Sequence, residues 1–198
     1  MTDEARNILV VAHGRRPDTV GAAARVIGAL RDAGATPVLS SDDRAELDSA
    51  IPGPLATLGA DVAVADIELA IVLGGDGTIL RAAELVREGS APVLGINMGH
   101  VGFLAEIERD DMDEAVRRVI DRDYTVEERL ALQVRIKDRD EQVIYETWAL
   151  NEATVEKASR ERMLEVVIEI DGRPLSSFGC DGIVVSTPTG STAYNFSA

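Results

Sequence analysis

The segment that most constrains the fold is an apolar run at residues 69–73, followed directly by G-G-D-G-T at residues 74–78. The run is typical of a buried strand, and residues 79–86 have the spacing of a helix. Glycines between the two allow a tight turn and the close approach of a ligand. The N–H groups and positive dipole at a helix start favour bound phosphate. The segment therefore predicts a strand, a phosphate-binding turn and a helix.

Asp76 in this turn is a candidate catalytic base. A carboxylate repels phosphate, but it can take the proton of a hydroxyl that attacks a phosphoryl group. Asp is also a common turn residue with no chemical role. On this segment alone both interpretations stay open.

Strand and helix patterns alternate over the first part of the chain. We expect short strands at residues 8–12, 36–39, 69–73 and 93–96, a helix from Pro17 that ends at Gly34, and a helix capped by Asp110 and Asp111. Residues 40–66 are polar, and we expect a long irregular connection there. The alternation predicts an α/β domain over residues 1–125 with a mostly parallel sheet. Ligands of such sheets bind beyond the carboxyl ends of the strands, where Asp76 would lie.

The pattern changes near residue 126. Leu132, Val134 and Ile136 alternate with polar residues, which is typical of a half-exposed strand. Asp171-Gly172 directly after an apolar run predicts a β-hairpin. We therefore expect a β-rich domain over residues 126–198.

Composition excludes several functions. The net charge of −15 argues against nucleic acid as the main partner. The chain has no apolar run of membrane-spanning length and no signal-peptide pattern at its start. Cys180 is its single cysteine, in keeping with a reducing compartment. We expect a cytoplasmic protein with no membrane partner. Because the protein is itself negatively charged, it would need clustered arginines or a metal ion to bind phosphate.

Two polar segments follow strands in the second region. Asn151-Glu152 joins an amide to an acceptor carboxylate. Residues 187–194 combine hydroxyls, a proline and a glycine with Tyr194, whose ring could pack on a base or a ribose. By chemistry alone, an ordinary polar loop is the better explanation of each segment.

Taken together, these motifs resemble those of the NAD kinase family. The matching segments are G-G-D-G-T, G-I-N-M-G-H-V-G-F-L at residues 95–104, Asn151-Glu152, and F-G-C-D-G-I-V-V-S-T-P-T-G-S-T-A-Y at residues 178–194. Lipid kinases and phosphofructokinases share a similar G-G-D-G-T, whereas the last two segments in this order are specific to the NAD kinase pattern. The resemblance extends over essentially the whole chain and implies an NAD kinase-like fold. Family members continue beyond Ala198, so it implies an incomplete β-rich domain, either a C-terminally truncated fragment or a degenerate protein.

The resemblance also implies a reaction and a set of site residues. The reaction would be phosphorylation of the 2′-hydroxyl of the adenosine ribose of NAD by ATP or polyphosphate, with Asp76 as the general base. We expect no metal site in the protein, because Mg²⁺ would arrive with the phosphoryl donor. We also expect a homo-oligomer, since a neighbouring subunit contributes NAD contacts in the family. The NAD contacts implied in this chain are Asp76, Gly77, Arg81, Asn151, Glu152, Arg162, Asp181, Thr192, Ala193, Tyr194, Asn195, Phe196 and Ser197.

Two alternatives remain. Another G-G-D-G-type kinase, acting on a lipid or a sugar, would require residues 187–194 to match by coincidence. A catalytically silent NAD(P)-binding module is suggested by the truncation. The loop with His13 and Arg16 could reach the phosphates of a donor, but we interpret it as solvated surface. For His100, a structural role is at least as well supported as a functional one.

Overall fold

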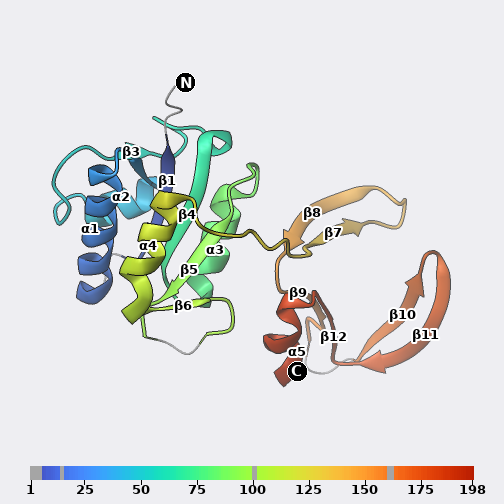
Figure 1. Ribbon diagram of the computed structural model, residues 1–198. Helices are drawn as coiled ribbons and strands as arrows, with labels where there is room; N and C mark the ends of the chain where they lie inside the picture. The colour runs from blue at the N-terminus through green and yellow to red at the C-terminus, as the bar shows by residue number, and fades with distance from the viewer. Residues whose placement is uncertain (1–5, 14–15, 100–101, 160–162) are drawn as a thin grey trace. The chain divides into compact units, whose positions relative to one another are not determined.

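The computed structural model describes residues 6–13, 16–99, 102–159 and 163–198 (Figure 1). The chain divides into two compact units, Met1–Val126 and Glu127–Ala198. Within the described ranges, the buried apolar side chains all belong to the first unit. The hydrophobic core that supports the candidate site therefore lies there.

The first unit is built on a six-stranded parallel sheet with the spatial order β3-β2-β1-β4-β5-β6. Its strands are β1 (Asn7–Ala12), β2 (Thr36–Leu39), β3 (Ala56–Thr57), β4 (Ile67–Gly74), β5 (Val93–Asn97) and β6 (Ile107–Glu108). The parallel sheet predicted from the sequence is confirmed. The strand order changes direction between β1 and β4, and doubly wound sheets bind ligands at the carboxyl ends of the strands beside such a switch point.

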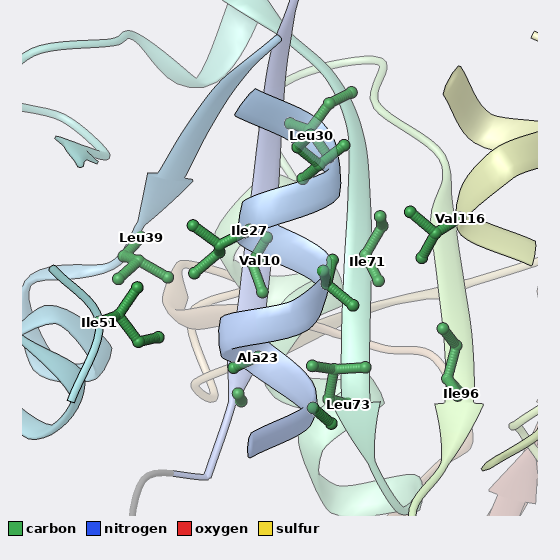
Figure 2. Close-up of a cluster of buried hydrophobic side chains, with 14 of the residues drawn as sticks. Val10, Ala23, Ile27, Leu30, Leu39, Ile51, Ile71, Leu73, Ile96 and Val116 are labelled. Carbon is green, nitrogen blue, oxygen red and sulfur yellow. The ribbon is translucent and has the colours of Figure 1, made fainter. Parts of the chain in front are cut away.

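Helices cover both faces of this sheet. One face carries α1 (Pro17–Asp32), α2 (Ser41–Leu47) and α4 (Met112–Asp121), and the other carries α3 (Asp76–Val86). Successive residues of β1 serve opposite faces, because Ile8 and Val10 join the first hydrophobic cluster and Leu9 and Val11 the second. Figure 2 shows the first cluster, with α1 running along the strands of the sheet. Full burial of each such side chain contributes roughly 1.5–3 kcal/mol to the stability of the fold. This packing holds the strands in place, and with them the strand ends.

Residues 40–66 are not the irregular connection that we expected. They contain α2, β3 and a short 3₁₀ turn. Ser40 is the N-cap of α2, and its Oγ accepts a hydrogen bond from the Asp43 N–H at 3.1 Å. Leu47 and Ile51 are buried in the main cluster. The prediction was wrong because these elements are too short to show a periodic apolar pattern.

The start of α4 also differs from the prediction. A 3₁₀ turn, Arg109–Asp111, precedes the helix. Asp111 occupies the N-cap position, but its side chain makes no capping hydrogen bond within the described residues. The predicted apolar face is present, since Met112, Val116 and Val119 are all buried. Packing of that face, rather than a side-chain cap, therefore stabilises the helix.

The described part of the second unit is made of antiparallel strand pairs, which confirms its β-rich character. β7 (Leu132–Lys137) pairs with β8 (Val143–Ala149), β9 (Glu152–Glu156) with β12 (Gly182–Ser186), and β10 (Leu164–Ile170) with β11 (Arg173–Cys180). Asp171 and Gly172, with φ of 52° and 70°, connect β10 to β11 as predicted. The polar segment after β12 is a 3₁₀ turn, Thr189–Thr192, followed by α5 (Tyr194–Ser197), where we had expected a loop.

Candidate active site

The first unit contains a pocket of about 740 Å³ beside the carboxyl ends of β1 and β4. Its walls come from the residues after β1, the start of α1, helix α2, the G-G-D-G-T turn and α3. Asp76 and Arg81 both line it. The pocket therefore lies at the switch point of the sheet, and it contains the side chain predicted to act as a base.

The G-G-D-G-T turn brings Asp76 into this wall. β4 ends at Gly74, Gly75 is the N-cap in an extended conformation, and Asp76 is the first residue of α3. A Cβ atom at Gly74 would lie 2.4 Å from the Thr78 Oγ1 atom, so a larger residue there would displace Thr78. The start of α3 itself lines the pocket, and the positive end of its dipole there favours an anionic ligand.

The carboxylate of Asp76 is held by backbone N–H groups of a second loop. Its Oδ1 atom accepts hydrogen bonds from Phe103 N at 3.1 Å and from Leu104 N at 3.0 Å, and Oδ2 lies 3.1 Å from Phe103 N. A carboxylate has about four acceptor positions. Asp76 is thus fixed in place and can still accept a hydrogen bond from a ligand hydroxyl. His100 of the same loop lies outside the described residues.

Arg81, one turn further along α3, forms an ion pair with α2. Its Nη2 atom donates to Asp43 Oδ1 at 2.7 Å and to the Ala12 carbonyl oxygen at 3.3 Å. The Asp43 side chain is only 2% exposed, against 40% for Arg81. Burial raises the pKa of Asp43, and hydrogen bonding to Arg81 and to Ser40 offsets part of that rise. The Asp43 Oδ2 atom has no hydrogen-bond partner among the described residues.

Sequence reasoning missed one part of this wall and interpreted another as solvated surface. Helix α2 contributes Asp43, and the signal that could have found it is Ser40 followed by acidic residues, an N-cap pattern. His13 and Arg16 are exposed, as expected, but they also line the pocket. Arg16 and Arg81 bring positive charge to this pocket of a chain whose net charge is −15. Asp42, Asp43, Glu46 and Asp76 also line the pocket, so an anionic ligand would bind at the arginines and at the start of α3 rather than to the lining as a whole.

In the second unit, the Asn151-Glu152 motif packs against the segment that follows β12. Thr187 N donates to the Asn151 carbonyl oxygen at 2.8 Å, and Thr187 Oγ1 donates to the Leu150 carbonyl oxygen at 2.6 Å. Gly190 N donates to Thr187 Oγ1 at 3.0 Å. A Cβ atom at Gly190 would lie 2.0 Å from the Asn151 carbonyl oxygen, so the position requires glycine. The two motifs, distant in sequence, form one local structure.

Two atoms of this structure are buried and unpaired. Asn151 Oδ1 and Glu152 Oε2 have no hydrogen-bond partner in the ranges that the structure describes. Most buried polar atoms in proteins are hydrogen-bonded, so an unpaired one calls for an explanation. Acceptor atoms left in this state are suited to a ligand that donates hydrogen bonds.

The other predicted contacts in this unit are more exposed. Asp181 forms an ion pair with Lys157. Tyr194 is 48% exposed, and its hydroxyl lies 3.4 Å from Glu156 Oε1. Arg162 lies outside the described residues. The remaining predicted contacts, all in or beside the 3₁₀ turn and α5, are Thr192, Ala193, Asn195, Phe196 and Ser197.

The part of the chain that the structure describes has no group of three or more His, Cys, Asp or Glu side chains placed to hold a metal ion. In the same part, no helix combines the length and the apolar character needed to cross a membrane. Cys180, at the end of β11, is a free cysteine.

The glycine-rich turn, the helix start and the pocket at the strand switch point are typical of phosphate-binding α/β proteins. Comparison with protein families narrows this class. The ATP-NAD kinase N-terminal domain matches residues 9–124, and the ATP-NAD kinase C-terminal domain matches residues 150–198. The chain belongs to the NAD kinase family.

Individual relatives agree with this assignment. The NAD kinase of Leifsonia xyli subsp. xyli (strain CTCB07) is 63% identical over 195 residues, which cover 98% of this chain and 64% of that protein. The NAD kinase of Thermobifida fusca (strain YX) is 52% identical over 199 residues, which cover 97% of this chain and 61% of that protein. The chain thus spans somewhat less than two thirds of the length of these curated relatives.

Two solved structures are similar in fold. Yeast NADH kinase complexed with NADH has a TM-score of 0.85 at 25% identity, covering 99% of this chain and 61% of that chain. An NAD kinase from Archaeoglobus fulgidus in complex with ATP has a TM-score of 0.66 at 26% identity, covering 98% of this chain and 65% of that chain. Both span the two units of this chain.

Proposed function

We propose that the protein is an NAD kinase, which transfers the terminal phosphoryl group of ATP or another donor to the 2′-hydroxyl of the adenosine ribose of NAD and so forms NADP. The observation that carries this proposal is the position of Asp76, an acceptor carboxylate at the start of α3 in the wall of a pocket of about 740 Å³. Membership of the family supports the choice of substrates, as do the relatives solved with NADH and with ATP.

Asp76 orients the attacking hydroxyl in this proposal and takes its proton as the oxygen bonds to the terminal phosphorus. The bond from that phosphorus to the bridging oxygen of the donor breaks, and ADP leaves when ATP is the donor. The start of α3 and the guanidinium of Arg81 stabilise the negative charge on the phosphates. The donor enters as its Mg²⁺ complex, because Mg²⁺ keeps several waters and binds largely through phosphate oxygens.

The second unit supplies further NAD contacts in the same proposal. The unpaired acceptors Asn151 Oδ1 and Glu152 Oε2 receive hydrogen bonds from NAD, and the half-exposed ring of Tyr194 packs on the dinucleotide. The proposed set is completed by Gly77, Arg81, Arg162, Asp181, Thr192, Ala193, Asn195, Phe196 and Ser197.

We also infer that the protein acts in the cytoplasm as a homo-oligomer. A single cysteine supports a reducing compartment, and the family resemblance supports NAD contacts shared between subunits. Sedimentation velocity with and without NAD tests the assembly, and a purely monomeric protein would contradict it.

The test of the reaction is an assay for NADP formation with NAD, Mg²⁺ and either ATP or polyphosphate. NADP that forms with wild-type protein and forms far more slowly with Asp76→Asn supports the proposal. Phosphorylation of a lipid or a sugar without NADP would indicate another kinase of the G-G-D-G type. Binding of NAD without turnover, whichever phosphoryl donor is supplied, would indicate a catalytically silent binding module. Either of these results overturns the proposal.

A further inference from the structure

Asp43 is a buried acidic residue for which the proposed reaction has no use. It lies in α2, its side chain is 2% exposed, and it lines the same pocket as Asp76. Its backbone is fixed by the N-cap of the helix, because Asp43 N donates to Ser40 Oγ at 3.1 Å. The carboxylate therefore has little freedom to move relative to the end of β2.

The contact that Asp43 makes across the pocket wall is with Arg81 of α3. Arg81 Nη2 donates to Asp43 Oδ1 at 2.7 Å and to the Ala12 carbonyl oxygen at 3.3 Å. These are the hydrogen bonds that Arg81 makes within the described residues, so its Nε and Nη1 atoms have no partner there. Nη2, which belongs to both paired-donor edges of the guanidinium, is anchored, and the N–H groups of Nε and Nη1 are left as separate donors for a ligand.

Stability alone does not account for an aspartate at this position. Asp43 Oδ2 is buried without a hydrogen-bond partner in the described part of the chain, and such an atom is unfavourable in the folded state. Buried ion pairs in general stabilise little, because the loss of hydration opposes the attraction between the charges. A neutral side chain would avoid this cost, so the carboxylate is better explained by what it does to Arg81.

We propose that Asp43 is a positioning residue that holds Arg81 Nη2 and thereby orients the guanidinium, so that a remaining N–H group, on Nη1 or Nε, binds a phosphate group of the ligand. This inference rests on the proposed function. A hydrogen bond from an arginine N–H group to a phosphate oxygen is charge-assisted and depends on its direction, and a mobile side chain loses that advantage. The phosphate belongs either to NAD or to the donor, and separate titrations with NAD and with ATP distinguish the two.

The direction in which ligand affinity changes when the Asp43 carboxylate is removed distinguishes a positioning role from a purely electrostatic one. If Asp43 contributed only its negative charge, its removal would reduce repulsion and tighten the binding of phosphate ligands. If it positions Arg81, removal weakens binding of the ligand whose phosphate Arg81 holds. We expect Asp43→Ala to raise the Kd of that ligand about tenfold, as for the loss of one hydrogen bond to a charged group. Asp43→Asn, which keeps an acceptor for Nη2, should lie between Asp43→Ala and the wild type.

Two comparisons complete the experiment. Asp42→Ala removes an exposed charge from the same helix and pocket, and it should leave the Kd unchanged or lower. In an Arg81→Gln background, Asp43→Ala should have no further effect on binding. Urea unfolding of each variant shows whether it is folded.

Three results would overturn the inference while the proposed function stands. The first is that Asp43→Ala binds both ligands as tightly as the wild type or more tightly. The second is that Arg81→Gln leaves the Kd unchanged. The third is that Asp43→Ala weakens binding in the Arg81→Gln background as much as it does in the wild type. A wild-type protein that binds neither NAD nor ATP would instead overturn the proposed function, and this inference with it.

Discussion

A Cβ atom at position 102 would lie 2.5 Å from the Oδ1 atom of Asp76, which is closer than such atoms approach in proteins. Gly102 therefore leaves the space that the Asp76 carboxylate occupies. The next two residues, Phe103 and Leu104, provide the N–H groups that bind this carboxylate. The loop thus leaves room for the Asp76 side chain at Gly102 and binds it through the two residues that follow.

This relationship predicts that Gly102→Ala displaces the proposed base. A misplacement of about 1 Å at a reacting group can reduce turnover about 10²-fold, and we expect a loss of that order in kcat for NADP formation. Gly21→Ala in α1 is a matched control, because a Cβ atom there meets nothing within 4 Å. A Gly102→Ala protein with wild-type kcat would show that the position of Asp76 does not matter for turnover.

The role of Asp76 as a base is tested by Asp76→Asn. The asparagine oxygen can replace Oδ1, which accepts from both Phe103 N and Leu104 N, so the loop should remain in place. Turnover should fall by roughly 10²–10⁴-fold, the usual contribution of a general base. NAD affinity, measured by calorimetry, should stay close to that of the wild type. Near-normal turnover in the folded variant would exclude Asp76 as the base.

Glu152→Gln should separate binding from stability. The Glu152 Oε2 atom is buried and has no hydrogen-bond partner among the residues described, so the charge there disfavours the folded state. We expect the variant to be at least as stable as the wild type in urea unfolding and yet to bind NAD more weakly. A variant that loses stability and keeps its NAD affinity would indicate a structural role for the carboxylate.

Tyr194→Ala tests the proposed contact between the ring and NAD. The ring is 48% exposed, so its removal should change the unfolding midpoint little. Loss of ring packing should weaken NAD binding by roughly 1–3 kcal/mol in a titration without donor. Tyr194→Phe keeps the ring and should retain most of the affinity. Unchanged NAD binding in Tyr194→Ala would remove this residue from the proposed site.

Glu68 predicts a dependence of stability on pH. Its carboxylate forms ion pairs with Arg6 Nη2 at 2.6 Å and with Arg122 Nη2 at 3.0 Å. Hydrogen bonding to Arg6 is the main cause that lowers the pKa of Glu68 from 4.5 to about 2. Because the pKa is lower in the folded chain than in the unfolded chain, the stabilisation is complete above pH 4.5 and is lost as the pH falls toward 2.

The corresponding variant is Glu68→Gln. At pH 7 we expect it to lower the free energy of unfolding by roughly 1–2 kcal/mol, with allowance for solvent screening. The difference from the wild type, measured by urea unfolding at several pH values, should shrink between pH 4.5 and 2, where the wild-type carboxyl takes up its proton. A difference that is independent of pH over this range would contradict the prediction.

The layered α/β arrangement could be predicted because its signals are local and repeated. Strand β1 is a continuous apolar run, and the buried face of α4 recurs with helical spacing from Met112 to Val119. Helix α2 gave no comparable signal. Of its residues Ser41–Leu47, the buried ones are Asp43 and Leu47, and the first of these is charged. The helix depends on its cap and on its packing against the sheet.

In the candidate site, too, some features could be predicted from the sequence and others could not. The location of Asp76 at the end of a strand follows from the G-G-D-G-T sequence and its neighbours. Its bonds to Phe103 and Leu104, and the pairing of Arg81 with Asp43, join segments that are far apart along the chain. No local pattern specifies such contacts, because they depend on the strand order of the sheet.

The same strand order has a consequence for how the protein folds. β1 is an interior strand whose neighbours are β2 and β4, and Ile8 pairs with Leu69. As the chain leaves the ribosome, β1 and β2 are made early, but β1 lacks its second neighbour until the residues of β4 have been synthesised. Parallel strands have no hairpin from which pairing can spread, so this contact requires closure of a long loop and should form slowly. The strands that join at this step are β1 and β4, and the pocket at their carboxyl ends can exist only after they have paired.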